Sequence, residues 1–394
     1  MTLISRIPVI FDTDPGVDDI IALLFALSSP ELEILAIIVS YGNTDLDSAY
    51  ANVLKSYQAI RRHLDLHPHD AIRFPNFFNA IKTIICRGSD GPLEGALHSA
   101  TYFHGRDGLG EINERHPDLN ITSIPEQLEY SKESGTEVAL RLLRERETHS
   151  ELVATHVGRI ICMGGALDVP GNTSPVAEFN FFADPYAARE LLSPETPYAF
   201  PFPLDRFLLL PLDITTPHQL PFQMYKERVD SSFDSPELSQ IPITHFTSAF
   251  LSHTRRIMKQ FGSDAMQLHD IVAVWCATQN PPTMKETYAT GWKAARRIFD
   301  IECTGEITRG MVVVDRREDP YYAPGANRAE VQAELERASH GYKDSVVLPA
   351  PVEVESPPSK DKNSRGVWCI TETPGSEALL ETLLKRVWGA FEAE

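Results

Sequence analysis

Short apolar runs and helical segments alternate over the first part of the chain. Residues 7–11 and 32–40 are rich in Ile, Val and Leu, and such runs predict strands buried on both faces of a sheet. Residues 18–27 and 47–62 have the apolar spacing of helices. The order strand, helix, strand, helix is typical of right-handed crossovers between parallel strands. The pattern therefore predicts an α/β fold with a mostly parallel, Rossmann-like central sheet flanked by helices.

Later segments extend this pattern over most of the chain. It predicts strands at 159–163, 207–212 and 367–371, a strand or edge hairpin at 307–314, and helices at 135–147, 185–192, 270–277 and 376–392. Residues 317–366 differ, because their second half is rich in Pro, Ser and Lys, as disordered segments are. We therefore expect a single domain over residues 1–394 with a disordered insertion at about 317–366.

Composition narrows the possible partners and the compartment. The chain has 36 Lys and Arg but 55 Asp and Glu, a net charge of −19, which disfavours nucleic acid and anionic membranes and favours a small neutral ligand or a bound cation. It has no apolar run of about 20 residues and no secretory signal at residues 1–7. Its five cysteines form no CxxC pair, so we expect a reducing, cytoplasmic location without disulfides.

The most informative motif is Asp12-Thr-Asp14-Pro-Gly-Val-Asp18-Asp19, which places four carboxylates within eight residues at the end of the first predicted strand. Ligands of open α/β sheets bind beyond such strand ends. Carboxylates this close repel each other unless a cation, a proton or hydrogen bonds offset their charge, and oxygen ligands without His or Cys favour calcium or magnesium. Capping of the following helix by Asp18 and Asp19 is the simpler alternative.

Two further motifs are weaker signals by themselves. Met163-Gly-Gly is followed by Glu178 and Asn180, which could bind hydroxyl groups or could belong to an ordinary loop. His269-Asp270 precedes an apolar helix, where Asp270 could cap the helix or bind a cation and His269 could donate a proton. The other histidines, such as His63, have no ligand spacing, and we expect them to be solvated.

Together these motifs resemble the inosine–uridine-preferring nucleoside hydrolase family. The matching residues follow the family's order: Asp12 to Asp19, Tyr41-Gly-Asn43, His104-Gly-Arg-Asp-Gly-Leu-Gly110, Met163-Gly-Gly165, Gly171-Asn172, Ala177-Glu-Phe-Asn180 with Asp184-Pro185, Pro211-Leu-Asp213, His269-Asp270 and Thr308-Arg-Gly310. The resemblance implies a calcium-dependent enzyme that hydrolyses the N-glycosidic bond of ribonucleosides such as uridine and inosine, releasing ribose and free base. It also implies a possible homo-oligomer.

The same resemblance implies a role for each matching residue. Asp14, Asp19 and Asp270 would hold the calcium ion, and Asp14 would also accept a proton from water. His269 would face the base and protonate it. The residues implied to bind the nucleoside are Asp18, Asn43, Met163, Asn172, Glu178, Asn180 and Asp270.

One segment departs from the family pattern. The family has a strand ending in a Gly-Pro-Leu-Thr-Asn turn before the Met-Gly-Gly strand, and the Thr carbonyl of that turn is a calcium ligand. Here only residues 148–158 occupy this place, which is too short for a strand and a crossover helix. We therefore expect an internal deletion near 148–158 that removes a core strand, its helix and one metal ligand.

Two other functions stay open, the first because of this departure and the second because an apolar strand followed by Asp-x-Asp also marks a phosphatase family. A catalytically impaired protein that binds a nucleoside or a metal is one alternative. A haloacid-dehalogenase-like phosphatase, with Asp12 as nucleophile, is a weaker one, because Pro15 stands where that family has Thr or Val. Contacts to the base are expected from loops at 69–92 and 246–261, and the composition of these loops does not indicate which base is preferred.

Overall fold

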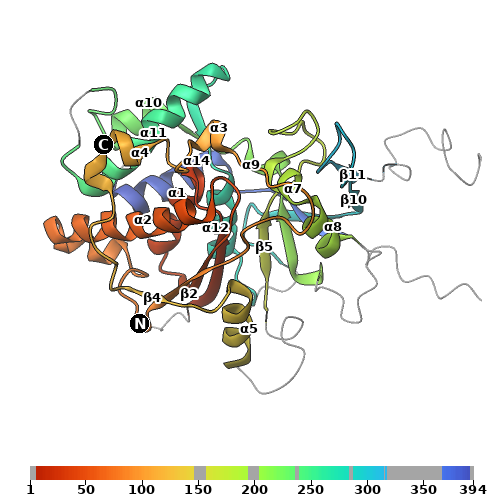
Figure 1. Cartoon of the computed structure of the whole chain (residues 1–394), viewed down its shortest axis with the longest axis horizontal. Helices are drawn as coiled ribbons and strands as arrows, with labels where there is room; N and C mark the ends of the chain where they lie inside the picture. The colour runs from red at the N-terminus through yellow and green to blue at the C-terminus, as the bar shows by residue number, and fades with distance from the viewer. Residues whose placement is uncertain are drawn as a thin grey trace, which may run out of the picture.

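The computed structural model of the chain describes residues 6–145, 157–193, 204–235, 239–283, 287–314, 316 and 366–390. Its main elements are two four-stranded sheets with helices packed around them (Figure 1). This arrangement confirms the predicted α/β class. In the described ranges, however, the main strands form two separate four-stranded sheets where one central sheet was expected, and two further strand pairs lie apart from them.

The first sheet is built from the N-terminal segments and is entirely parallel. Its order is β1-β2-β3-β4, and the strands are β1 (Ile7–Thr13), β2 (Leu32–Val39), β3 (Thr83–Arg87) and β4 (Leu128–Tyr130). In the register Thr13 is opposite Val39, so β1 and β2 end at the same edge. The turns that follow β1 and β2 therefore lie side by side, and they carry the Asp-rich motif and Asn43.

The second sheet combines segments from the middle and the end of the chain. Its order is β5-β6-β12-β9, with β5 (Ile160–Met163), β6 (Phe207–Leu210) and β12 (Val367–Glu372) parallel and β9 (Lys293–Arg297) antiparallel to β12. Two antiparallel pairs complete the strands, namely β7 (Gln219–Pro221) with β8 (Ala265–Gln267), and β10 (Phe299–Ile301) with β11 (Val312–Val314). Of the strand or edge hairpin predicted at 307–314, only β11 is found there, and its antiparallel partner β10 lies before that range.

The outer strands β1 and β5 contradict the expectation that the first strand is buried on both faces. In β1, Pro8 and Asp12 are exposed and most other residues are half-buried, and all four residues of β5 are half-buried. Their neighbours β2 and β6 are largely or fully buried. The physical reason is that β1 and β5 each pair with one strand only in the described part of the chain.

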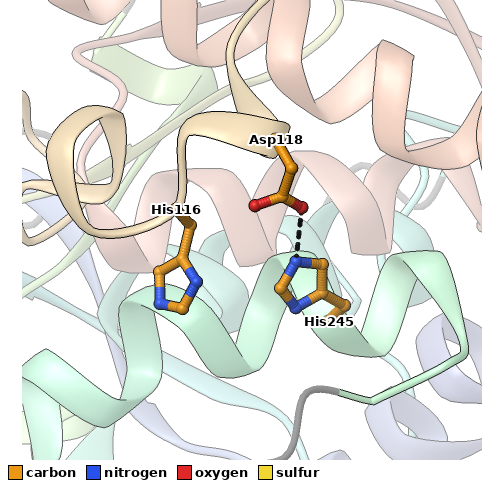
Figure 2. A group of neighbouring side chains, drawn as sticks. All are labelled: His116, Asp118 and His245. Carbon is orange, nitrogen blue, oxygen red and sulfur yellow. Dashed lines mark hydrogen bonds and ion pairs between the residues drawn. The ribbon is translucent and has the colours of Figure 1, made fainter.

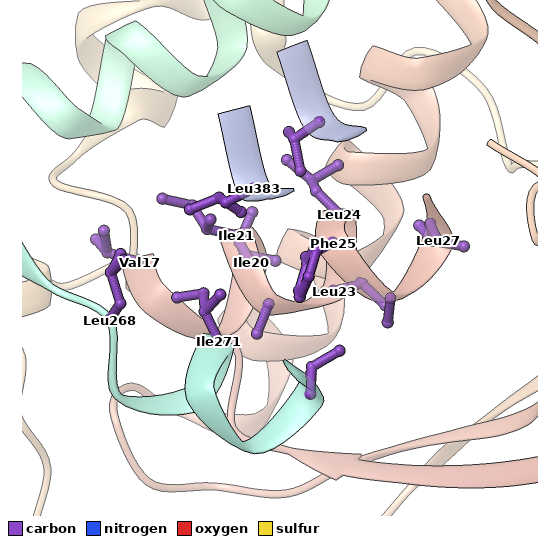
Figure 3. Packing of buried hydrophobic residues seen from close by; sticks show 14 of the residues in the cluster. Val17, Ile20, Ile21, Leu23, Leu24, Phe25, Leu27, Leu268, Ile271 and Leu383 are labelled. Atoms are coloured by element: carbon purple, nitrogen blue, oxygen red, sulfur yellow. The ribbon is translucent and has the colours of Figure 1, made fainter. Parts of the chain in front are cut away.

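Helix α1 (Val17–Leu27) lies at the centre of the main hydrophobic core (Figure 3). All of its residues except Asp18 are buried, which fits its nearly continuous apolar sequence. It packs against α12 (His269–Gln279) and against the C-terminal η5 (Leu384–Trp388), which follows α14 (Ser376–Leu383). Because α12 also packs against β5, this helix connects the two sheets (Figure 1).

The remaining helices surround this core. They are α2 (Leu46–Leu66), η1 (Pro68–Arg73), α3 (Thr101–His104), α4 (Ile112–Arg115), η2 (Pro117–Leu119), α5 (Gly135–Glu145), α7 (Phe179–Ala183), α8 (Pro185–Leu192), η3 (Leu204–Arg206), α9 (Leu212–Thr215), α10 (Phe222–Arg228) and α11 (Pro242–Gln260).

Two predictions about element bounds were wrong in detail. The strand predicted to reach residue 212 stops at Leu210. The next residue, Pro211, has no amide hydrogen to donate to a sheet ladder, and it is the N-cap of α9. The loop predicted at 246–261 is almost entirely part of α11, whose buried face explains its apolar residues.

Some predictions fall on residues outside the described ranges. The predicted insertion at 317–366 does so except for Gly366, and of the short 148–158 segment only the last two residues are described. The deletion near 148–158 therefore stays a prediction. None of the described helices is long and apolar enough to cross a membrane.

Candidate active site

The turn between β1 and α1 is organised around the carboxylate of Asp19, which is 4% exposed. Its Oδ1 accepts hydrogen bonds from Thr13 Oγ1 at 2.7 Å and from the Asp14 amide at 3.3 Å. Its Oδ2 accepts from the Gly16 amide at 3.1 Å and from Asn43 Nδ2 at 2.7 Å. Four donors thus occupy the four acceptor positions of one carboxylate. Asp19 therefore sets the shape of the turn, and a cation bound to it would replace one of these donors.

Asn43 joins this turn to the end of β2. Its backbone amide donates to Asp14 Oδ2 at 2.8 Å, and its side-chain Nδ2 donates to the Asp14 carbonyl at 3.2 Å as well as to Asp19. The adjacent Gly42 has to be glycine, because a Cβ there would lie 2.1 Å from Asp14 Oδ2. The Tyr-Gly-Asn motif therefore holds two of the predicted metal-binding carboxylates in place.

Asp270, in the first turn of α12, completes a set of carboxylates from two helices. Asp18, Asp19 and Asp270 each offer a ligand oxygen, and these oxygens all lie within 4.8 Å of one another. The sequence predicted Asp14, Asp19 and Asp270 as the metal-binding set; the structure groups Asp18 with the latter two, while Asp14 lies beside them and is bound to Asn43. Because a hard divalent cation prefers oxygen ligands and this set offers carboxylate oxygens alone, the donor set fits calcium.

The pKa values of these carboxylates also fit a site that binds a cation. Burial, and then the charge of Asp19, raise the pKa of Asp18 to about 8, and the same two causes raise the pKa values of Asp14 and Asp270. In the described part of the chain no Lys or Arg forms an ion pair with these carboxylates. Desolvated like charges without a protein counter-ion need protons or a cation to be stable.

Glu178 anchors the side of the site that comes from the second sheet. It caps α7 and is 1% exposed. Its Oε2 accepts from the Gly165 amide at 2.8 Å and the Phe181 amide at 3.2 Å, and its Oε1 accepts from the Asn180 amide at 2.8 Å. The charge of Glu178 contributes to the raised pKa values of Asp18 and Asp270, so this loop borders the carboxylate cluster.

Two asparagine side chains lie next to the Glu178 loop, and one of them contacts the end of β5. Asn180 Nδ2 donates to Met163 Sδ at 3.4 Å, and Asn172 Oδ1 accepts from the Phe179 amide at 2.9 Å. Gly165 has φ of +79°, a backbone conformation that favours glycine, and a Cβ there would lie 3.0 Å from the Phe181 ring. The structure therefore brings together the predicted sugar-binding residues Met163, Asn172, Glu178 and Asn180.

The comparison with known proteins agrees with this arrangement. Residues 9–340 match the sequence profile of the family described as inosine-uridine preferring nucleoside hydrolase. The chain belongs to this nucleoside hydrolase family. Its members are hydrolases that act on N-glycosyl bonds, and this membership sets aside the phosphatase alternative.

Relatives and solved structures extend this comparison. The chain is 28% identical over 349 residues to the pyrimidine-specific ribonucleoside hydrolase RihA of Klebsiella pneumoniae, a match that covers 86% of this chain and 96% of that protein. A solved structure of the purine-preferring ribonucleoside hydrolase from Gardnerella vaginalis has a TM-score of 0.62 at 18% identity, covering 97% of this chain and 98% of that one. A plant nucleoside hydrolase, PpNRh1, has a TM-score of 0.58 at 19% identity, covering 98% and 99%. These structures support the nucleoside hydrolase fold.

His269 has a different environment from the one expected of a proton donor. Its Nδ1 is 2.8 Å from Thr215 Oγ1 and its Nε2 is 3.0 Å from Gln267 Oε1. Burial lowers its pKa to about 4, so the imidazole is neutral at neutral pH. His269 would therefore have to exchange one of its two partners before it could donate a proton to the base of a nucleoside.

His104 is a residue of this nucleoside hydrolase that lies at the site and was not among the predicted site residues. Its Nδ1 accepts from the Val17 amide at 3.0 Å, and a Cβ at Gly16 would lie 2.5 Å from that nitrogen. Burial lowers the pKa of His104 to about 4, so it remains a neutral acceptor at the start of α1. The signal that could have found it was its place in the His-Gly-Arg-Asp-Gly motif.

Another histidine prediction was wrong. His63 was expected to be solvated, but it is 2% exposed and its Nε2 lies 2.8 Å from Asp70 Oδ2. Its partner Asp70 lies seven residues further along the chain, beyond the end of α2, so the helical spacing of α2 does not predict this contact.

The five cysteines are free, as predicted.

Proposed function

We propose that this chain is a calcium-dependent ribonucleoside hydrolase that cleaves uridine- and inosine-type substrates to ribose and free base. The observation that carries this proposal is the set formed by Asp18, Asp19 and Asp270. These three carboxylates come from two different helices, converge within 4.8 Å and have no protein counter-ion in the described ranges.

The residues present suit a bound calcium ion. Asp18, Asp19 and Asp270 would hold it, with Asp14 next to them. When bound, calcium would lower the pKa of water in its coordination sphere and bind the two ribose hydroxyls. The exclusively oxygen ligands support calcium over zinc or another metal that prefers nitrogen or sulfur.

Asp14 is the carboxylate best suited to accept a proton from water. One of its oxygens is held by the Asn43 amide at 2.8 Å, which fixes the orientation of the carboxylate. Burial and the neighbouring Asp19 charge raise its pKa, and a raised pKa makes a carboxylate a stronger base. Departure of the base leaves positive charge on ribose, which the surrounding carboxylates would stabilise.

The second side of the site would bind the sugar. Glu178 is held by three backbone amides, Asn180 is oriented by Met163, and Asn172 is oriented by the Phe179 amide. A site that hydrogen-bonds ribose hydroxyls should discriminate against 2′-deoxynucleosides, because the missing hydroxyl leaves polar groups unpaired.

The test is hydrolysis by the purified chain. We expect release of base and reducing sugar from uridine and inosine with calcium present, loss of activity with a chelator, and much slower cleavage of 2′-deoxyuridine. Both substrates are needed, because the RihA relative is named as pyrimidine-specific and the Gardnerella enzyme as purine-preferring. No release from any ribonucleoside in the presence of calcium would refute the proposed activity.

A second candidate is binding of a nucleoside or metal without turnover. It is favoured by the half-exposed β1 and β5, each of which pairs with one strand only in the described ranges, and by the predicted loss of one metal ligand near 148–158. Calorimetry distinguishes the two candidates: heat of binding from ribose or uridine without product formation supports this second one.

Three further properties remain predictions: a cytoplasmic location, a single domain and a homo-oligomer.

A further inference from the structure

A second group of possible metal ligands, separate from the carboxylate cluster, lies on α11 and a nearby turn. His116 follows α4, Asp118 lies in η2, and His245 lies in the first turn of α11 (Figure 2). Each offers a ligand atom, and these atoms all lie within 4.8 Å of one another. The group therefore joins two segments that are 127 residues apart in the sequence.

The turn that carries His116 and Asp118 is held independently of these side chains. The Leu119 amide donates to the His116 carbonyl at 2.9 Å, and Arg62 Nη1 donates to the Asp118 carbonyl at 2.7 Å. Gln58 Nε2 donates to the Asn120 carbonyl at 3.0 Å. Because α2 supplies both side chains, the backbone of the turn is already in place before any ligand binds.

The three side chains are oriented toward one another. His245 Nε2 is 2.8 Å from Asp118 Oδ2, and the rings of His116 and His245 have centroids 5.6 Å apart. The side chain of His245 is 12% exposed and that of Asp118 is 54% exposed. The group is thus open to solvent on the carboxylate side, where water could complete the coordination of an ion.

We propose that His116, Asp118 and His245 form a site for a divalent transition-metal ion, with zinc as the best candidate. Two imidazoles and one carboxylate with an open fourth position match the three protein ligands of many zinc sites. Imidazole nitrogens favour zinc over calcium, whereas the Asp18, Asp19 and Asp270 set offers oxygen alone. The chain would therefore carry two metal sites of different chemistry.

An ion at this site would fasten the 104–120 segment to α11. That segment already contacts α11 through Arg115, whose Nη2 donates to the Ala249 carbonyl at 2.6 Å, and through Gly110, where a Cβ would lie 2.5 Å from His253. His104, which receives the hydrogen bond from Val17 in the candidate active site, begins the same segment. The predicted effect of zinc is greater stability of the folded chain.

The experiment is a zinc titration of the full chain by calorimetry after the carboxylate site has been saturated with calcium. We expect one zinc ion per chain. His116→Ala and His245→Ala should each weaken zinc binding by at least the roughly 10–100-fold that loss of an outer-sphere partner costs. Asp118→Asn keeps the size of the side chain, so it tests the carboxylate without opening space. His69→Ala, at an exposed histidine outside the group, is the matched control.

Two further readouts separate metal binding from misfolding. Each variant should bind calcium like the wild type, and the visible absorption of bound Co²⁺ should be present in the wild type and His69→Ala but absent in His245→Ala. No zinc binding, or zinc binding that survives both histidine substitutions, would overturn the proposal and leave His245 and Asp118 as a simple hydrogen-bonded pair. The outcome is independent of whether the chain hydrolyses nucleosides.

Discussion

The two sheets supply different halves of the candidate active site. The first sheet presents the Asp-rich turn after β1 and Asn43 after β2, and the second presents Met163 at the end of β5 and the Glu178 loop. In the described ranges, no backbone hydrogen bond between strands joins the halves; α12 and the C-terminal segment connect them by packing. Side-chain packing, more than a continuous sheet, therefore sets the distance between the two halves.

The outer strands of the two sheets, β1 and β5, are more exposed because the sheets are separate. β1 and β5 have apolar sequences suited to interior strands, but both are half-exposed, while β2 and β6 are buried. Asp12 of β1 contributes to the raised pKa of Cys162 in β5, so the two edges lie near each other. A strand placed between them would cover both; the deletion near 148–158 stays a prediction.

The largest effect is expected from Asp270→Asn, because Asp270 is the carboxylate that α12 contributes to the Asp18–Asp19 set. Activity on uridine and inosine should fall by at least about 100-fold. The metal-free variant should unfold at a higher temperature than the metal-free wild type, because one uncompensated buried charge is gone. Sugar-release assays and thermal unfolding measure the two effects, with the exposed Asp47→Asn as control. Activity within tenfold of wild type would contradict the assigned role.

Shortening a side chain of α12 tests whether this helix sets the positions of the two halves of the candidate active site. Ile271→Ala and Leu209→Ala both remove side chains that are 0% exposed, and each should lower the free energy of unfolding by about 2–5 kcal/mol. Only Ile271→Ala, on the connecting helix, should also weaken calcium binding, by roughly tenfold. Denaturant unfolding and calcium titration provide both numbers. Equal losses of calcium affinity in the two variants would show that α12 has no special role.

The second half can be perturbed alone through Glu178→Gln. The glutamine amide would direct N–H groups at the Gly165, Phe181 or Asn180 amides, which now donate to a carboxylate. We expect a loss of about 1–3 kcal/mol in unfolding free energy and a higher KM, with calcium affinity little changed. Glu94→Gln, at an exposed position, is the control. An unchanged KM would remove Glu178 from the substrate-binding side.

The smallest effect is expected in the first half, from Lys55→Met. Lys55 donates to Asn52 Oδ1, and Asn52 in turn donates to the carbonyls of Pro15 and Asp107. Burial lowers the pKa of Lys55 from 10.5 to about 8. Its charged form therefore lowers stability fully below about pH 8, and this penalty disappears as the pH rises toward 10.5. The variant should be more stable by on the order of 1–3 kcal/mol at pH 7.

The check is the pH dependence of that difference. Unfolding free energies of wild type and Lys55→Met should converge between pH 8 and pH 10.5. A difference that stays constant over this range would show that burial does not lower the pKa of Lys55. The charge of Lys55 would then not reduce the free energy of unfolding.

Much of the fold could be predicted because the local signals were strong. The apolar run of β2 and the helical spacing of α1 gave boundaries within one residue of those observed. The burial of β1 was predicted wrongly, because a strand's sequence does not reveal whether both of its edges are paired. The α11 segment was read as a loop, since its buried aromatic residues have no partner visible in the sequence.

The site was predictable where its residues lie in one motif. Asp18 and Asp19 were evident as neighbours at a strand end, whereas their approach to Asp270 depends on how α12 packs against α1. The neutral state of His269 follows from burial and from Thr215 and Gln267, which the sequence alone does not place around it. The grouping of His116 with His245 likewise requires the tertiary structure.

The most direct test of the central claim is a calorimetric calcium titration of the metal-free chain. We expect one calcium site per chain that is lost in Asp270→Asn and retained in Asp47→Asn. Calcium binding by Asp270→Asn with the affinity of the wild type, or no binding by the wild type, would contradict the claim that carboxylates from two helices hold one cation.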